Sequence, residues 1–231
     1  MRIVKISLTG VSIILLALII GRHDVFAGQS NKDNERLEQQ YRDLEKPQGA
    51  LYKIAKKSGE KHTTIAFLPD RSVIAPNLRQ LSRRSTDVII GRVLANYSQL
   101  NSAKDEVQKF LTVFVQMVYK GTVVNAGQIT IKTLGGSWLY SDGVSLTWMP
   151  VGETSPLDGK SYIFFLTKDG DGNYIPSLGA QGVFEMDFEI GVIVPIDMNK
   201  RDPVVAKYAN APLQEFMDEI TSVIAEEVHE F

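Results

Sequence analysis

Cysteine is absent from the 231 residues of this chain, and histidine occurs only at His23, His62 and His229. The absence of cysteine excludes disulfides, thiolate metal sites, a cysteine nucleophile and a lipoprotein attachment site. Because the three histidines lie far apart in the sequence, neither a histidine-rich metal site nor a Ser-His-Asp triad is expected. No Walker or dinucleotide-binding glycine spacing is present. The sequence therefore predicts a protein that is not an enzyme and needs no cofactor.

The chain has no excess of positive charge: its formal net charge is −2. Proteins that bind nucleic acids usually carry a basic face, so nucleic acid is not an expected partner. Hydrophobic residues make up 44% and charged residues 23% of the chain, which is typical of a globular protein. A chain of this length can bury a substantial core in one domain of ordinary size with appendages.

The N-terminus has the pattern of a signal peptide. Arg2 and Lys5 precede an apolar run from Val11 to Ile20, and Val25-Phe26-Ala27 precedes an expected cut before Gly28. We predict a signal peptide over residues 1–27 and export to the periplasm or the exterior of a bacterial cell, with no membrane contact after cleavage. The alternative is an uncleaved segment that anchors the chain in the membrane by its N-terminus.

Residues 28–72 are polar. Leu37, Tyr41 and Leu44 form a narrow helical stripe, and the lysine-rich stretch from Leu51 to His62 has the composition of a solvated linker. These patterns predict a partly helical or flexible N-terminal arm over residues 28–72.

From residue 87 onward, short runs of β-branched and aromatic residues alternate with turn residues, which is typical of β-strands. A hairpin is expected within Ser137–Trp148, because Asp142-Gly143 favours a tight turn. The other strands are expected near Asp87–Tyr97, Val107–Tyr119, Gln128–Leu134, Ser161–Lys168, Tyr174–Leu178, Gly182–Ile190 and Val192–Ile196.

The second of these strands is apolar on both faces. One face carries Leu111, Val113, Val115 and Met117, and the other begins with Phe110 and continues through Thr112, Phe114 and Gln116. Such a strand is expected in the wall of a closed barrel whose outer face is covered by another element.

Two helices are expected beside the barrel. A short one lies between Pro76 and Ser85, where Leu78 and Leu81 are three residues apart. The other begins at Pro212 and closes the barrel with an apolar stripe. Its members are Leu213, Phe216, Met217, Ile220, Val223, Ile224 and Val228.

This order of elements predicts a mainly β fold over residues 73–231. We expect a five-stranded Greek-key β-barrel of the OB type, with an added hairpin, a short helix before the first strand and a C-terminal amphipathic helix.

The run S-T-D-V-I-I-G-R-V from Ser85, followed by V-F-V-Q-M-V-Y-K-G ending at Gly121, resembles the opening of netrin-like domains. That family includes the tissue inhibitors of metalloproteinases. The later segments Gly135-Gly136, Gly159–Leu166 and Gln181–Phe184 resemble exported bacterial proteins of unknown function with the same barrel. The resemblance extends over about Leu78 to Pro195 and implies an OB-like fold. Its motifs are structural rather than catalytic.

The inhibitors of this family chelate a protease zinc through an N-terminal cysteine. This chain has no cysteine, so that mechanism does not carry over.

Asp169, Asp171 and Asn173 place oxygen ligands at alternate positions, as at the start of a calcium loop. Such a loop needs glycine at its sixth position and glutamate at its twelfth, where this chain has Tyr174 and Ala180. The sequence therefore favours a glycine-rich hairpin turn, while a partly hydrated calcium contact stays open.

Trp138, Tyr140 and Trp148 are the candidate ligand-binding residues. They lie in the added hairpin, close to the strands that OB barrels use for binding. A stacking platform for a sugar or a peptide is one interpretation. The other interpretation is a plug that closes one end of the barrel. The sequence favours the plug, because aromatic residues in such a hairpin are more often buried in a core.

These observations lead to three functional hypotheses. The first is an exported, non-catalytic module that binds a protein, a peptide or a glycan on the face of strands two and three and at the loops 96–105 and 168–173. The second is a protease inhibitor of netrin-like type without zinc chelation. The third is a hydrolase that uses Glu185 and Asp187, which alternation places on one strand face.

Overall fold

Strands dominate the part of the chain that the structure, a computed structural model, describes, namely residues 49–229. The mainly β fold with a C-terminal helix that the sequence predicts is confirmed. The expected signal peptide and residues 28–48 lie outside the described residues. Within those residues, no helix has both the length and the apolar character needed to cross a membrane.

Eight strands form one large sheet in the order β11-β10-β9-β7-β2-β3-β4-β8, and β8 also pairs with β7. The strands β7, β2, β3, β4 and β8 therefore close into a ring. The bounds in this sheet are β2 Asp87–Leu100, β3 Val107–Lys120, β4 Gln128–Leu134, β7 Ser161–Lys168, β8 Tyr174–Pro176, β9 Val183–Asp187, β10 Val192–Pro195 and β11 Ala211–Pro212. Each expected strand of the ring is present.

The pairing within the ring mixes antiparallel and parallel neighbours. β2, β3 and β4 follow one another as antiparallel neighbours, and β7 pairs antiparallel with the other edge of β2. The ring closes where β8 pairs antiparallel with β7 and parallel with β4, at Ile131 and Tyr174. Successive side chains of a strand point to opposite faces, so every second side chain of each of these strands points into the ring.

The strand β7 shows this alternation most clearly. Tyr162, Phe164 and Leu166 join the cluster enclosed by the ring, whereas Ile163 and Phe165 join a second cluster on the outer face. All five side chains are buried. β7 therefore reads as a continuous apolar run because it has a core on each side.

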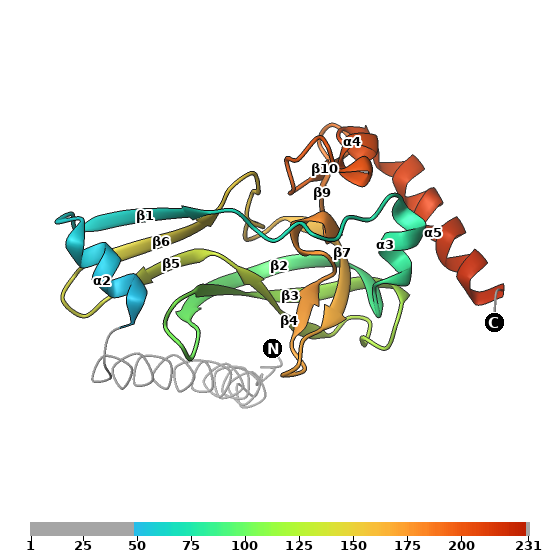
Figure 1. Cartoon of the computed structure of the whole chain (residues 1–231). Helices are drawn as coiled ribbons and strands as arrows, with labels where there is room; N and C mark the ends of the chain where they lie inside the picture. The colour runs from blue at the N-terminus through green and yellow to red at the C-terminus, as the bar shows by residue number, and fades with distance from the viewer. Residues whose placement is uncertain (1–48, 230–231) are drawn as a thin grey trace, which may run out of the picture. The chain divides into compact units, whose positions relative to one another are not determined.

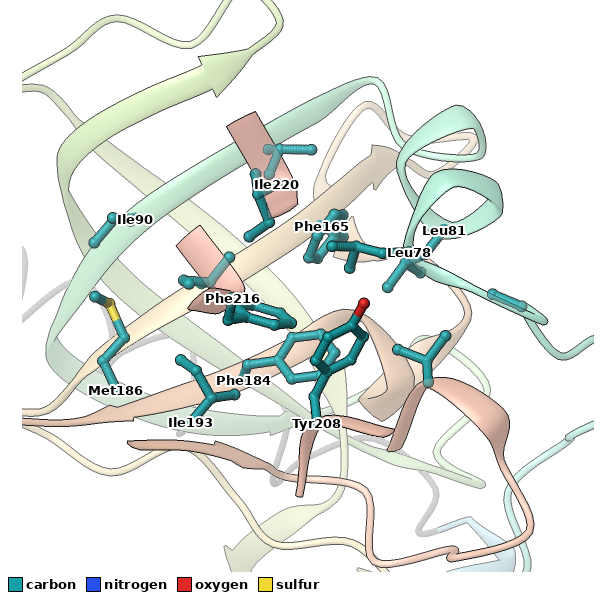
Figure 2. Close-up of a cluster of buried hydrophobic side chains, with 14 residues drawn as sticks. Leu78, Leu81, Ile90, Phe165, Phe184, Met186, Ile193, Tyr208, Phe216 and Ile220 are labelled. Carbon is teal, nitrogen blue, oxygen red and sulfur yellow. The ribbon is translucent and has the colours of Figure 1, made fainter. Parts of the chain in front are cut away.

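Three helices cover the outer face of β2, β7, β9 and β10. They are α3 Leu78–Arg83, α4 Pro203–Tyr208 and the C-terminal α5 Leu213–His229. In Figure 2 the Phe216 ring of α5 lies against Phe184 of β9 and Tyr208 of α4, with centroid distances of 4.9 Å and 4.7 Å. The expected C-terminal helix thus packs on the outside of the barrel wall.

Three predicted burials are wrong. Val228 is 70% exposed because it lies near the end of α5, and Met117 and Phe114 of β3 are also exposed. The covering cluster of helices is built on β2, β7, β9 and β10 rather than on β3. The outer cover that the sequence predicted for β3 belongs to β7.

A second, three-stranded sheet has the order β1-β6-β5. Its strands are β1 His62–Phe67, β5 Gly136–Leu139 and β6 Ser145–Pro150, and the expected hairpin around Asp142 is its β5–β6 pair. The chain passes from β4 to β5 through Gly135 and Gly136. Their φ angles are 97° and 121°, values that residues with a side chain rarely adopt. Figure 1 shows this sheet and α5 at opposite ends of the unit formed by residues 49–229.

The helix α2 Ala50–Lys57 and the strand β1 lie within the predicted N-terminal arm. Leu51 and Ala55 of α2 are buried in a third cluster together with Trp138, so the interpretation of this stretch as a solvated linker is wrong. β1 pairs in parallel with β6. Leu51 and Ala55, four positions apart, lie on the same side of α2, whereas its lysines are exposed.

The residues that carry the netrin-like resemblance meet where β3 ends. The carboxylate of Asp87, 2% exposed, accepts hydrogen bonds from the backbone amides of Thr122 (2.8 Å) and Val123 (3.3 Å). Gly121 has a φ of 105°, and a Cβ there would lie 2.1 Å from Asp87 Oδ1. The Asp and the Gly of this motif therefore form one structural unit.

Candidate functional site

A cleft of about 670 Å³ lies between the three-stranded sheet and the barrel. Its walls come from β3 and β4 on the barrel side, from β1, β5 and β6 on the other side, and from the loops 69–74, 153–156 and 196–202. Asp169, at the β7–β8 turn, lines the same cleft. A volume of this size is typical of small-molecule and peptide sites.

One part of the cleft is apolar. Phe67 and Trp148 stack with ring centroids 4.8 Å apart and an angle of 18° between the rings. Exposed aliphatic side chains also line the cleft; they are Val73, Ile74, Leu134 and Met149. Exposed apolar side chains gathered in a concave surface are typical of a binding site.

The barrel side of the cleft carries two lysines whose ammonium groups already have partners. Lys109 of β3 donates to Ser155 Oγ (2.7 Å) and to the carbonyl of Pro156 (3.4 Å), and partial burial lowers its pKa. Lys132 of β4 forms an ion pair with Asp169.

The loops 69–74, 153–156 and 196–202 form an acidic side of the cleft. The Arg71 guanidinium forms an ion pair with Asp197 and lies 3.5 Å from Glu153 Oε1, and it thereby ties together three loops. Burial raises the pKa of the Glu153 carboxyl, although the charge of Arg71 opposes that shift. Hydrogen bonding to Asp197 raises the pKa of Arg71 in turn.

Asp202 completes the acidic side. Its side chain is 1% exposed, and Oδ1 caps α4 by accepting from the amides of Val204 (2.9 Å) and Val205 (3.3 Å). The other oxygen, Oδ2, is buried and has no hydrogen-bond partner. Burial is the main cause that raises the pKa of this carboxyl. Buried carboxylate oxygens normally have a hydrogen-bond partner. A ligand that donates a hydrogen bond to Oδ2 would supply the missing partner.

The three aromatic candidates from the sequence occupy two different environments. Trp148 lines the cleft. Trp138 and Tyr140 are buried in the third cluster, where Tyr140 contacts the edge of the Tyr52 ring at 4.9 Å and burial raises its pKa to about 12. The structure therefore places only Trp148 of the three where a ligand could meet it.

The calcium candidates form the turn between β7 and β8. Asp169 accepts hydrogen bonds from the amides of Asp171 (3.0 Å) and Asn173 (2.8 Å), and the nearby Lys132 lowers its pKa. Its carboxylate thus has backbone and lysine donors around it. Across residues 49–229, no group of three or more His, Cys, Asp or Glu side chains is arranged to hold a metal ion.

The remaining catalytic candidates lie apart from the cleft. Glu185 binds Lys160 and accepts from the Tyr162 hydroxyl (3.3 Å), while Asp187 accepts from two amides of the β9–β10 turn. His62 Nδ1 lies 2.7 Å from Ser145 Oγ on an exposed edge. Neither pair lines the cleft.

Sequence reasoning missed the acidic side of the cleft. Arg71, Glu153 and Asp202 come from loops far apart in the sequence, and no spacing rule connects them. The only local signal is Asp202-Pro203, which is typical of a helix start and would have predicted α4 rather than a binding site.

No protein-family model matches the chain, and no curated protein matches it.

Proposed function

We propose that this protein is an exported, non-catalytic binding module that holds a peptide segment in the cleft between the three-stranded sheet and the barrel. The ring of β2, β3, β4, β7 and β8 is, in this proposal, an OB-type Greek-key barrel of the netrin-like kind. OB barrels bind ligands on the face of their second and third strands and at the loop between the fourth and fifth. Here those parts are β3, β4 and the β7–β8 turn.

The observation that carries the proposal is the coincidence of the cleft with this face. Gln108 and Lys109 of β3, Leu134 of β4 and Asp169 of the turn all line it. The ring order supports the OB assignment, because its third and fifth strands, β4 and β8, pair in parallel.

A peptide fits the cleft chemistry better than a glycan does. Aliphatic residues such as Ile74 and Met149 line the cleft together with the Phe67–Trp148 stack. Charged groups of both signs also line it, in the Arg71–Asp197 and Lys132–Asp169 ion pairs. Sugars need many hydroxyl partners around an aromatic face, whereas peptides present aliphatic and charged side chains. The module is expected to act outside the cytoplasm.

The two tryptophans of the chain allow a direct test. In Trp138→Phe protein, Trp148 is the only tryptophan and reports on the cleft; in Trp148→Phe protein, Trp138 reports on the buried third cluster. Panels of peptides and of short glycans are added to both variants, and emission and melting temperature are recorded. We expect peptides to change the emission of Trp148 and to leave that of Trp138 unchanged.

Equal responses of the two tryptophans, or no response to any peptide or glycan, would contradict the proposal. A response of Trp148 to glycans alone would replace the peptide by a sugar. A panel of metallo- and serine proteases is also assayed in the presence of the protein. If their activity is unchanged, the module binds its ligand without inhibiting these proteases.

A further inference from the structure

We propose that the acidic side of the cleft is a subsite for an organic cation, the ammonium or guanidinium group of a ligand side chain, with Oδ2 of Asp202 as its main acceptor. The inference rests on the proposed function, since it names the chemical group that the cleft recognises.

The first argument is the state of Asp202. Capping α4 uses only Oδ1, yet the whole side chain is 99% buried and Oδ2 has no partner within residues 49–229. Asparagine caps helices as well as aspartate does, so the cap does not explain the second charged oxygen. An unpaired buried acceptor costs stability, and such a cost is often retained where a ligand supplies the partner.

The second argument is the local charge. The carboxylates of Glu153, Asp197 and Asp202 line the cleft around Arg71, which is the one cation that the described residues place among them. Arg71 is engaged by Asp197 and reaches Glu153 at 3.5 Å, which leaves Asp202 without a direct countercharge. Two negative charges are therefore in excess, and a bound cation would offset the cost of burying them.

The third argument concerns the kind of cation. Residues 49–229 hold no group of three or more His, Cys, Asp or Glu side chains that could bind a metal ion. The apolar part of the cleft, with Phe67 and Trp148, adjoins the acidic side along the chain, since Arg71 follows Phe67 by four residues and Glu153 follows Trp148 by five. A group with an apolar body and a cationic end satisfies both regions. Lysine and arginine side chains have that form, and their stems pack readily on aromatic faces.

Benzamidine and benzamide are the matched probes for this subsite, because they share size and shape and differ in charge. Binding of each to the full-length chain is measured by calorimetry. We expect benzamidine to bind at least about tenfold more tightly than benzamide, which corresponds to about 1.4 kcal/mol. Asp202→Asn should remove this preference, and Glu189→Gln, at an exposed acid of the β9–β10 turn outside the cleft, should keep it.

Folding is checked by melting each variant. If Asp202→Asn does not fold, Glu153→Gln, which removes a charge from the same side without touching the helix cap, must weaken benzamidine binding instead. Equal binding of the two probes, or an unchanged preference in the folded Asp202→Asn variant, overturns the cation subsite.

The two proposals fail in different ways. If a peptide without a positive charge changes Trp148 emission while benzamidine shows no preference over benzamide, the cleft binds ligands but the cation subsite is wrong. If no ligand changes Trp148 emission, both are wrong.

Discussion

At the scale of single residues, Asp87 is the clearest case of a polar side chain buried for a structural purpose. It accepts from two amides beyond β3 and from the Thr86 hydroxyl (2.7 Å), and Gly121 leaves the space that its carboxylate occupies. The motif that suggested a netrin-like domain is thus explained by backbone hydrogen bonding. It needs no ligand.

Asp87→Ala removes the acceptor and leaves these donors in a largely buried place. Because each unsatisfied buried donor costs about 1–3 kcal/mol, we expect the free energy of unfolding to fall by about 2–4 kcal/mol. Urea denaturation followed by circular dichroism measures the change. Asp171→Ala, at an exposed position in the β7–β8 turn, is the control and should change it by less than about 0.5 kcal/mol. Equal effects of the two substitutions would refute this role of Asp87.

At the scale of elements, one acidic residue of the β5–β6 hairpin adds polar contacts to the apolar packing of α2. Asp142 accepts from Tyr52 (2.8 Å) and Lys56 (2.6 Å), and hydrogen bonding to Lys56 is the main cause that lowers its pKa from 3.8 to about 2. A carboxyl whose pKa is lower in the folded chain stabilises the fold above its unfolded pKa, and this stabilisation is lost as pH falls through the folded value.

Asp142→Asn should therefore melt at a lower temperature than the wild type above about pH 4, and the two melting curves should converge as pH falls toward 2. Melting is followed in Trp148→Phe protein, where Trp138 in the third cluster reports on the packing of α2. A difference that persists unchanged at pH 2 would show that Asp142 acts in some way other than through its charge.

The C-terminal helix depends on Phe216, which is 1% exposed among Phe184 and Tyr208 (Figure 2). Phe216→Ala should lower the free energy of unfolding by about 3–5 kcal/mol, as for other buried aromatic residues. Val228→Ala, on the same helix but 70% exposed, should cost less than about 0.5 kcal/mol in the same denaturation experiment. Similar costs for both would mean that α5 is not docked through Phe216.

The elements that the sequence predicted are those whose signals are local. β3 and β7 are apolar runs with flanking turns, and α5 has a stripe of helical period, so each could be located without its partners. β1 could not, because its six residues form a strand only by pairing in parallel with β6, some eighty residues away. α2 was concealed by its lysines, since Leu51 and Ala55 are its only buried residues.

At the scale of the whole described unit, one part of the site has a local sequence signal, and the other parts depend on contacts between segments far apart in the sequence. Trp148 was a candidate because aromatic residues in a hairpin stand out in a sequence. The cleft itself exists because β1 and the loops after it bring Phe67 and Arg71 opposite β3 and β4, and that juxtaposition is a property of the assembled fold. Asp202 is a candidate binding residue because the fold buries its second oxygen without a hydrogen-bond partner, which no sequence pattern indicates.

The position of ligand contacts tests the central claim most directly. Amide chemical shifts of the isotope-labelled full-length chain are recorded with the peptide that most strongly changes Trp148 emission. If the cleft is the binding site, the largest shifts fall on its lining residues, including Lys109, Trp148 and Asp202. Shifts concentrated instead on the exposed β9–β10 turn at Phe188 and Ile190, or along α5, would contradict the account.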